Sequence, residues 1–305
     1  MVCVLFDNVR SSVPPLVREW GPIVGPGVIW GSSYLFIAEG LTAMRPAGIT
    51  FVRTAIGFAV LSFIRGSRKA VRREDRGRIA LLGLIWLALP MSMFPFAEQH
   101  VSSALTGLLN AATPLTVAVV AAAQVRTMPS RRVLLALGVG LLGALMIAAP
   151  SLNEGRSTSW GVGLILFALC CYGFAINLAR PLQQRNGAVP LMWRAVGVAA
   201  LLTAPTGIPA VLDAQWNTRA VLSMLALGGL GTGVANIMVA TAAGRTSATR
   251  ASSMGFIIPA VSLALGVFVR NEHVDALVVV GGAVCVAGAL LLATASRTPQ
   301  ASASS

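Results

Sequence analysis

The fold is decided by residues 101–149, which read VSSALTGLLNAATPLTVAVVAAAQVRTMPSRRVLLALGVGLLGALMIAA. Shifted by 145 residues, this stretch overlies residues 246–294, which read TSATRASSMGFIIPAVSLALGVFVRNEHVDALVVVGGAVCVAGALLLAT. In both copies an apolar segment with an internal proline, Pro114 or Pro259, leads through a short charged break into a second apolar segment. Few positions are identical, so the comparison depends on the shared pattern. That pattern indicates an internal duplication, which governs how the whole fold is interpreted.

A stripe of small residues at i+4 spacing recurs at the same four places in the second apolar segment of each copy. The stripes are Ala136, Gly140, Ala144 and Ala148 in the first copy, and Gly281, Cys285, Ala289 and Ala293 in the second. Small residues at this spacing let membrane helices approach closely. We expect each stripe to pack against a neighbouring helix or another protomer.

The composition indicates a membrane protein. Of the 305 residues, 56% are hydrophobic and 11% are charged, and the mean hydropathy is +0.79. Soluble domains carry about 25% charged residues. The formal charge of +13 would suit nucleic acid, but the arginines lie between apolar runs, so we expect no nucleic-acid partner. The four cysteines lack CxxC spacing, so we expect no disulfide framework, metal or cofactor.

Ten apolar segments are each close to the roughly 20 residues that a helical span needs. They are residues 22–39, 47–65, 78–97, 101–123, 132–149, 160–178, 188–207, 219–240, 247–269 and 275–294. The segments are continuously apolar and do not alternate, so they predict α-helices and exclude barrel strands. The predicted fold class is an all-α polytopic membrane protein.

The basic residues predict the orientation of these spans. With the N-terminus inside, seventeen Lys and Arg residues fall in cytoplasmic segments and four in outside segments. This bias is a positive-inside signal, so both termini are predicted to be cytoplasmic. The lipid bilayer is accordingly expected to surround the chain.

Each copy holds five spans, and an odd number makes the second copy enter the membrane from the opposite side. The sequence thus predicts two inverted five-helix repeats, residues 22–150 and 158–296, as in many secondary transporters. Residues 1–21 are predicted to form a cytoplasmic tail, and residues 297–305 a disordered one. Binding is expected near the midplane, where the repeats meet.

The two matched prolines predict helix kinks in the fourth and ninth spans. Each removes a backbone donor and frees a carbonyl four residues earlier, at Asn110 for Pro114 and at Gly255 for Pro259. A freed carbonyl in lipid needs a partner or a wet cavity. The kinks either face the interior or serve packing alone, and the Asn110 amide favours the first interpretation.

Two arginines, Arg53 and Arg194, lie inside spans at matched positions of the repeats. At 1.5 Å per residue each lies about 10 Å from its nearer membrane surface. A cation at this depth costs a few kcal/mol unless it meets a cavity or a partner. The two arginines either extend to the interface or line an aqueous vestibule and attract anionic groups such as carboxylates.

Aromatic and polar side chains suggest a mixed pocket for a small ligand. Trp30 and Tyr34 fall in the middle of the first span beside Ser32 and Ser33. The further candidates are Tyr172, Asn177, Trp193 and Asn236. The residues predicted to bind substrate are Trp30, Tyr34, Arg53, Asn110, Trp193, Arg194 and Asn236.

Acidic residues approach the membrane only at its edge. Glu39 ends the first span, and Glu98 follows the third, close to His100. Glu98 and His100 form either a proton relay or a solvated loop pair. Triads, paired carboxylates and phosphate-binding glycine loops are absent from the sequence, so no enzyme activity is expected.

Four stretches of the sequence are characteristic: WGSSYLFIAEGL from Trp30, VRTAIGFAVL around Arg53, SSALTGLLNAATPL, and RASSMGFIIPAVSLALGVFVRNE. In these stretches the chain resembles the EamA family of the drug/metabolite transporter superfamily, and the resemblance covers residues 22–295. Family members often end spans four and nine with a Gly-Glu pair. Here the second copy carries Glu272 after Asn271, whereas the first has Val125 and Arg126.

This resemblance implies an inner-membrane carrier that exports amino acids or related small metabolites by alternating access. Its small-molecule substrate would bind in a cavity between the repeats. The alternative is a non-transporting receptor or assembly subunit of the same fold. This alternative would be favoured if side chains filled the space between the repeats. The sequence does not decide whether transport is coupled to a proton or whether the protein forms a homodimer.

Overall fold

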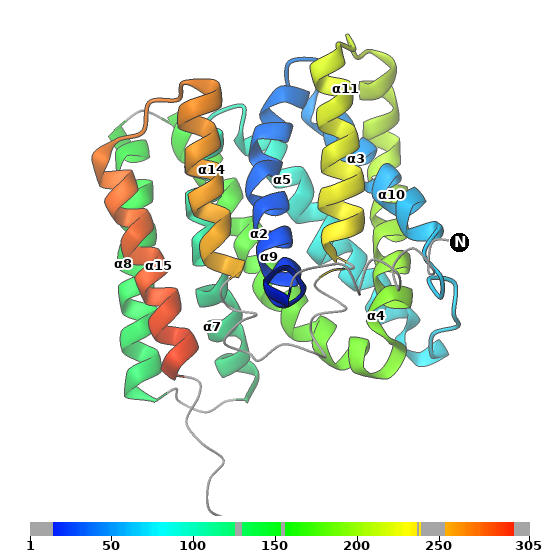
Figure 1. Cartoon of the computed structure of the whole chain (residues 1–305), viewed down its shortest axis with the longest axis horizontal. Coiled ribbons are helices and arrows are strands. Elements are labelled where there is room, and N and C mark those ends of the chain that lie inside the picture. The colour runs from blue at the N-terminus through cyan, green and yellow to red at the C-terminus, as the bar shows by residue number, and fades with distance from the viewer. Residues whose placement is uncertain (1–14, 126–129, 154–155, 237, 239–253, 296–305) are drawn as a thin grey trace, which may run out of the picture.

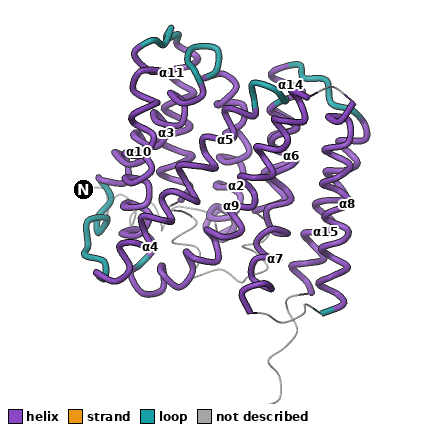
Figure 2. Tube along the Cα trace, turned by 180° about the vertical axis from the view of Figure 1, so that it is seen from behind, coloured by secondary structure: helices purple, strands orange, loops and turns teal. Residues whose placement is uncertain are grey.

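The structure of the chain, a computed structural model, describes residues 15–125, 130–153, 156–236, 238 and 254–295. Across these ranges the chain forms helices and connecting loops and contains no strand (Figures 1 and 2). The predicted all-α fold is confirmed. The predicted disordered tail, residues 297–305, lies outside the described residues.

Ten helical crossings are present in the described part of the chain. Five of them are long and apolar enough to span a bilayer, and four are shorter but apolar. The tenth is the 26-residue helix α2. In chain order the crossings are α2 (Pro15–Gly40), α3 (Pro46–Ser62), α4–η2–α5 (Arg76–Leu82, Gly83–Ala88, Leu89–Ala97), α6–η3–α7 (Ser103–Leu109, Asn110–Ala112, Thr113–Val125), α8 (Arg131–Asn153), α9 (Arg156–Asn186), α10 (Ala188–Leu212), α11–η4 (Thr218–Leu225, Ala226–Val234), α14 (Met254–Arg270) and α15 (Ala276–Ala295).

The crossings from α2 to α8 and from α9 to α15 form two inverted repeats. Equivalent contacts occur twice: α2 packs against α14 as α9 packs against α7, and α3 packs against η4 as α10 packs against η2. On the axis between the repeats, α3 contacts α10 and α8 contacts α15, each helix meeting its own equivalent. This pairing is what an inverted two-fold arrangement requires.

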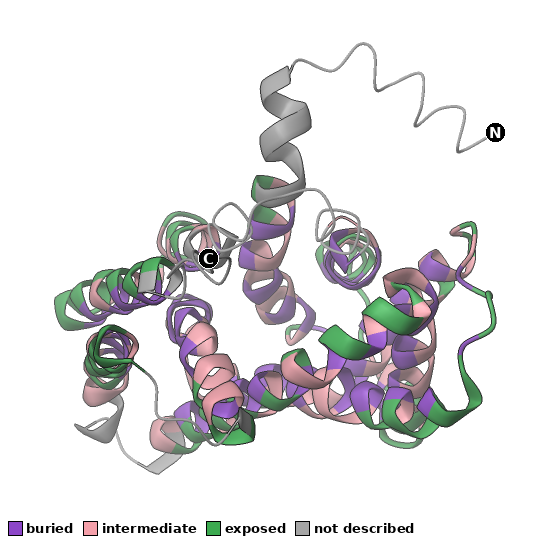
Figure 3. Ribbon diagram, turned by 90° about the horizontal axis from the view of Figure 1, so that it is seen from below, coloured by how far each residue is buried: buried purple, intermediate pink, exposed green. Residues whose placement is uncertain are grey.

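The outer surface of the bundle is apolar, as a membrane protein requires. Figure 3 shows buried residues on the helix faces that point inward and exposed residues on those that point outward. The exposed side chains include the large apolar residues Leu201, Leu212 and Phe268. An apolar surface of this extent would be unfavourable in water, whereas lipid tails solvate it.

The first helix begins earlier than predicted, at Pro15 and not at residue 22. The predicted tail of residues 1–21 therefore overlaps the start of α2. Residues 1–14 lie outside the described residues.

The small-residue stripes join α8 to α15 within one chain. A Cβ added at Gly143 would lie 2.3 Å from the backbone nitrogen of Cys285, and one at Gly288 would lie 2.4 Å from the backbone nitrogen of Gly140. The backbones thus approach each other closely, which only small residues allow. The expectation that the stripes pack against a neighbouring helix is confirmed.

Gly143→Ala should destabilise the protein, because the new methyl group collides with the backbone of α15. Overpacking of this kind costs about 1–3 kcal/mol, measurable by denaturant unfolding in detergent micelles. The matched control is Gly138→Ala on the same helix, where an added Cβ has no neighbour within 4 Å. Equal stability of the two variants would contradict the described α8–α15 packing.

One end of the bundle is closed by polar contacts between the repeats. We call it the sealed end and define it by Glu39, Glu98, Ser103, Arg270 and Glu272. Arg270 forms an ion pair with Glu39 at 2.7 Å and another with Glu272 at 3.4 Å. Glu39 belongs to the first repeat and Glu272 to the second, so Arg270 links the two repeats.

Glu272 caps the N-terminus of α6, which belongs to the other repeat. Its carboxylate accepts hydrogen bonds from the backbone N–H groups of Ser103 (3.2 Å) and Ala104 (2.9 Å) and from the Ser103 hydroxyl (2.7 Å). Asn271 has a φ of +51°, which ends α14 and turns the chain toward α6. A carboxylate here satisfies helix N–H groups that have no partner within α6.

Glu272→Ala should lower the free energy of unfolding by about 1–3 kcal/mol, because two N–H groups at the start of α6 lose a charged acceptor. Denaturant unfolding in micelles measures this loss. Glu74→Ala is the control, since Glu74 forms only a solvent-exposed pair with Arg72, and such pairs contribute about 0–1 kcal/mol. A loss no larger than that of the control would show that the cap contributes little.

The opposite end carries the basic loop between α3 and α4. Its one fully buried acid, Asp75, forms an ion pair with Arg185 at 3.0 Å and accepts a hydrogen bond from the Asn186 amide at 2.7 Å. Asn186 in turn accepts a hydrogen bond from the backbone N–H of Arg72. These contacts attach the loop of the first repeat to the end of α9.

Candidate functional site

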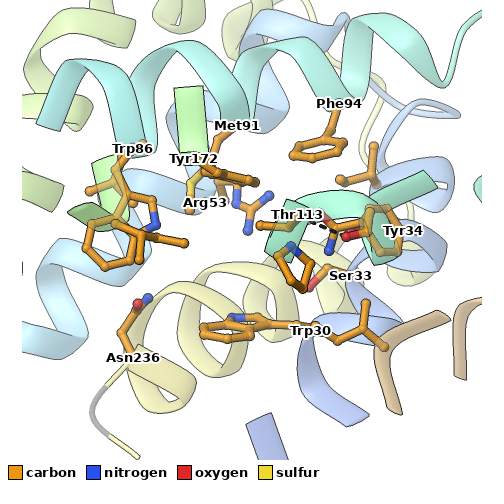
Figure 4. Close-up of a pocket in the computed structure, with 16 residues that line it drawn as sticks. Trp30, Ser33, Tyr34, Arg53, Trp86, Met91, Phe94, Thr113, Tyr172 and Asn236 are labelled. Carbon is orange, nitrogen blue, oxygen red and sulfur yellow. Dashed lines mark hydrogen bonds between the residues drawn. The ribbon is translucent and has the colours of Figure 1, made fainter. Parts of the chain in front are cut away.

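A cavity of about 230 Å³ lies where the two repeats meet. This volume is slightly below the about 300–1,000 Å³ of typical ligand pockets, so it suits a small molecule. Its walls are largely aromatic and apolar, with a few polar groups (Figure 4). The lining residues are Trp30, Ser33, Tyr34, Ile37, Arg53, Trp86, Leu87, Met91, Phe94, Asn110, Thr113, Pro114, Tyr172, Ile176, Asn236 and Ile258.

Arg53 places a positive charge inside the cavity. Its side chain is 5% exposed, and its Nε donates a hydrogen bond of 3.4 Å to the Thr232 hydroxyl. Among the described residues no carboxylate forms an ion pair with it. Figure 4 shows its guanidinium directed into the space between Tyr172 and Thr113. A buried cation without a counterion is costly, so an anionic group in the cavity would be stabilised.

The aromatic side chains form a connected wall beside Arg53. Tyr34 meets Phe94 edge to face at a centroid distance of 5.8 Å, and Phe94 stacks on Tyr172 at 6.0 Å. The indole N–H of Trp30 donates a hydrogen bond of 3.0 Å to the Gly231 carbonyl of the other repeat. These contacts hold the rings in place along the cavity wall, where they could contact an apolar or aromatic ligand.

The chain in front of Pro114 forms the 3₁₀ segment η3, Asn110–Ala112, and lines the cavity. The Thr113 hydroxyl donates hydrogen bonds to the Asn110 backbone carbonyl (2.8 Å) and to its side-chain oxygen (3.0 Å). The carbonyl freed by Pro114 therefore has a partner within the cavity wall. Pro259 lies inside the continuous helix α14 and outside the cavity lining.

Two π-helical segments occupy equivalent crossings of the two repeats, and the sequence interpretation missed both. They are η2, Gly83–Ala88, and η4, Ala226–Val234. Pro90 follows η2, and η4 is rich in glycine, which are the available sequence signals. π-Helical segments are frequent at functional sites. Here η2 supplies Trp86 and Leu87 to the cavity, and Asn236 follows η4.

The cavity brings together five of the seven residues predicted to bind substrate: Trp30, Tyr34, Arg53, Asn110 and Asn236. It also includes Trp86, Phe94 and Thr113, which the sequence interpretation did not single out. Asn177, a further pocket candidate, instead donates hydrogen bonds to the Val117 and Gly173 carbonyls between α7 and α9.

Trp193 and Arg194 are not in the cavity lining. The Trp193 indole donates a hydrogen bond of 2.8 Å to the Ser62 hydroxyl and stacks on Phe58. Arg194 is partly exposed and donates hydrogen bonds to the carbonyls of Ser67 and Pro190. Arg53 and Arg194, although they occupy matched positions in the repeats, thus have different surroundings. The guanidinium of Arg194 is hydrogen-bonded to backbone carbonyls near the basic loop, whereas that of Arg53 lies in the cavity.

Comparisons with known proteins match nearly the whole chain. The profile of the EamA-like transporter family matches residues 22–149 and 159–294. An uncharacterized transporter of Bacillus subtilis, YoaV, is 23% identical over 90% of this chain and 96% of its own. The pseudopaline exporter CntI of Pseudomonas aeruginosa is 26% identical over 86% of this chain and 90% of its own.

The fold also has a solved counterpart. A crystal structure of another protein superposes with a TM-score of 0.62 at 16% identity, covering 90% of this chain and 98% of that one. At this identity the likeness shows the fold alone. The family profile covers both repeats, and the inverted arrangement of the helices agrees with it. The chain therefore belongs to the EamA-like transporter family.

Proposed function

We propose that this transporter exports a small amphipathic metabolite with a carboxylate group, such as an amino acid or a related organic acid. The observation that carries the proposal is the buried Arg53, which lies without a carboxylate partner among the described residues in a cavity with aromatic walls. A substrate carboxylate would bind the guanidinium, and the apolar part of the substrate would contact the rings of Trp30 and Tyr34.

Export by alternating access is consistent with the position of this cavity. It lies between inverted repeats, and rocking of one repeat against the other is how such folds expose a fixed site to each side in turn. A relative with 26% identity is named an exporter. A receptor or assembly subunit would be favoured by a filled interior, and the cavity speaks against it.

The proposed location is the bacterial inner membrane, with both termini cytoplasmic. The end of the bundle opposite the sealed end carries the loop with Arg65, Arg68, Lys69, Arg72 and Arg73. Basic loops stay on the cytoplasmic side during insertion. The sealed end would then face outward.

A substrate screen tests the proposal. Cells that overproduce the protein are grown on a panel of toxic amino-acid analogues and organic acids, and each resistance found is followed by transport measurements in proteoliposomes. We expect at least one carboxylate-bearing solute to be transported. Failure of every amino acid and organic acid, under any imposed gradient, would contradict the proposal.

Arg53→Gln should lower transport of that solute by about 10- to 100-fold, since a hydrogen bond to a charged group contributes about 1.5–3 kcal/mol. Arg53→Lys keeps the charge but loses the planar fork, so an intermediate loss is expected. Arg194→Gln is the matched control outside the cavity and should transport normally. If Arg53→Gln and Arg194→Gln changed transport equally, the result would show that Arg53 does not bind the substrate.

A further inference from the structure

Glu98 is a buried carboxyl group without a hydrogen-bond partner. It directly follows α5 at the sealed end, and both its carboxylate oxygens are inaccessible to solvent although the residue as a whole is partly exposed. No described residue donates a hydrogen bond to either oxygen. Its neighbours Glu39 and Glu272 are paired with Arg270. A buried carboxylate without partners is strongly unfavourable, whereas the neutral acid is tolerated.

The surrounding charges do not compensate for this burial. Burial raises the pKa of Glu98 well above its usual value, and repulsion from Glu272 adds to the effect. Arg270 and Arg53 oppose the shift without cancelling it. Tyr34 also interacts electrostatically with Glu98. Further ionisable groups at the sealed end include Glu39, His100, His273 and Asp275. Arg45 and Asp213 line a neighbouring hollow that shares Gln99 with the hollow beside Glu98.

Glu98 borders a polar hollow at the sealed end. This hollow has a volume of about 370 Å³, and its lining includes Glu98, Gln99, His100, Ser102, His273 and Asp275. Glu98 also interacts electrostatically with Arg53 and Tyr34, which line the central cavity. Glu98 therefore lines the polar hollow and influences charges in the central cavity, whose lining it does not join.

We propose that Glu98 is a proton-binding site of the sealed arrangement. One proton from water in the hollow adds to a carboxylate oxygen and forms the neutral acid, and the same proton returns to water when the sealed end opens and Glu98 becomes hydrated. The sealed arrangement then binds one proton more than the open one. Lower pH therefore favours the sealed arrangement. Between the pKa of Glu98 in the open arrangement and its higher pKa in the sealed one, the ratio of sealed to open protein rises by up to about tenfold for each pH unit that the pH falls. Proton binding itself needs no transported solute, so its failure is distinguishable from failure of the proposed function.

Infrared difference spectroscopy of the full chain in lipid bilayers tests the site directly. Between pH 5 and 8 the wild type should show the C=O stretch of a protonated carboxyl group, and Glu98→Gln should lack it. The matched control Glu74→Gln removes an exposed carboxylate and should keep the band. A band unchanged in Glu98→Gln, or no band in the wild type, would overturn the proposal.

Thermal unfolding in micelles gives a second readout. When folding raises the pKa of a carboxyl group, the folded protein loses stability as the pH rises above the pKa that this group has in the unfolded chain. Glu98→Gln removes this loss, so it should unfold at a higher temperature than the wild type at pH 8, and the difference should shrink toward pH 5. Glu74→Gln should follow the wild type at every pH. A Glu98→Gln protein that is less stable at pH 8, or that fails to fold, would show that Glu98 is charged and partnered.

Discussion

The structure depends on a guanidinium held in the interior of a membrane protein without a carboxylate to neutralise it among the described residues. Arg53 is 5% exposed and donates a hydrogen bond to the Thr232 hydroxyl. Proteins keep such groups where a ligand or water supplies what the protein does not. The aromatic wall, the 3₁₀ segment before Pro114 and the residues near both π-helices all border this charge. The cavity is therefore arranged around a buried positive charge.

The inverted repeats explain how such a cavity can exist in a tightly packed bundle. Close packing between equivalent helices, with the backbones of α8 and α15 nearly touching, holds the two halves together at the edge. The cavity lies between the halves, away from that contact. At the sealed end the repeats meet through Arg270 and through the cap that Glu272 places on α6. These polar contacts are replaceable by water, as a gate requires, whereas the α8–α15 contact is not.

Much of the fold was predictable from the sequence, because span length and the distribution of arginine follow from the physics of the bilayer. The sequence gives the depth of a residue in the membrane but not its rotation about the helix axis. For this reason Arg53 and Arg194 looked equivalent, although only Arg53 lines the cavity. The π-helices were missed, although Pro90 after η2 and the glycines of η4 were available as signals. The sequence leaves open whether Glu98 and His100 form a proton relay or a solvated loop pair, because it does not show that the carboxylate oxygens of Glu98 are buried.

The central claim is that Arg53 binds the anionic group of the transported solute. The most direct measurement is an experimental structure of the full chain with that solute bound. Our account predicts a carboxylate about 2.7–2.9 Å from the Arg53 nitrogens, with the rest of the solute against Trp30 and Tyr34. A solute bound elsewhere, or an Arg53 paired with a carboxylate of the protein itself, would contradict the account.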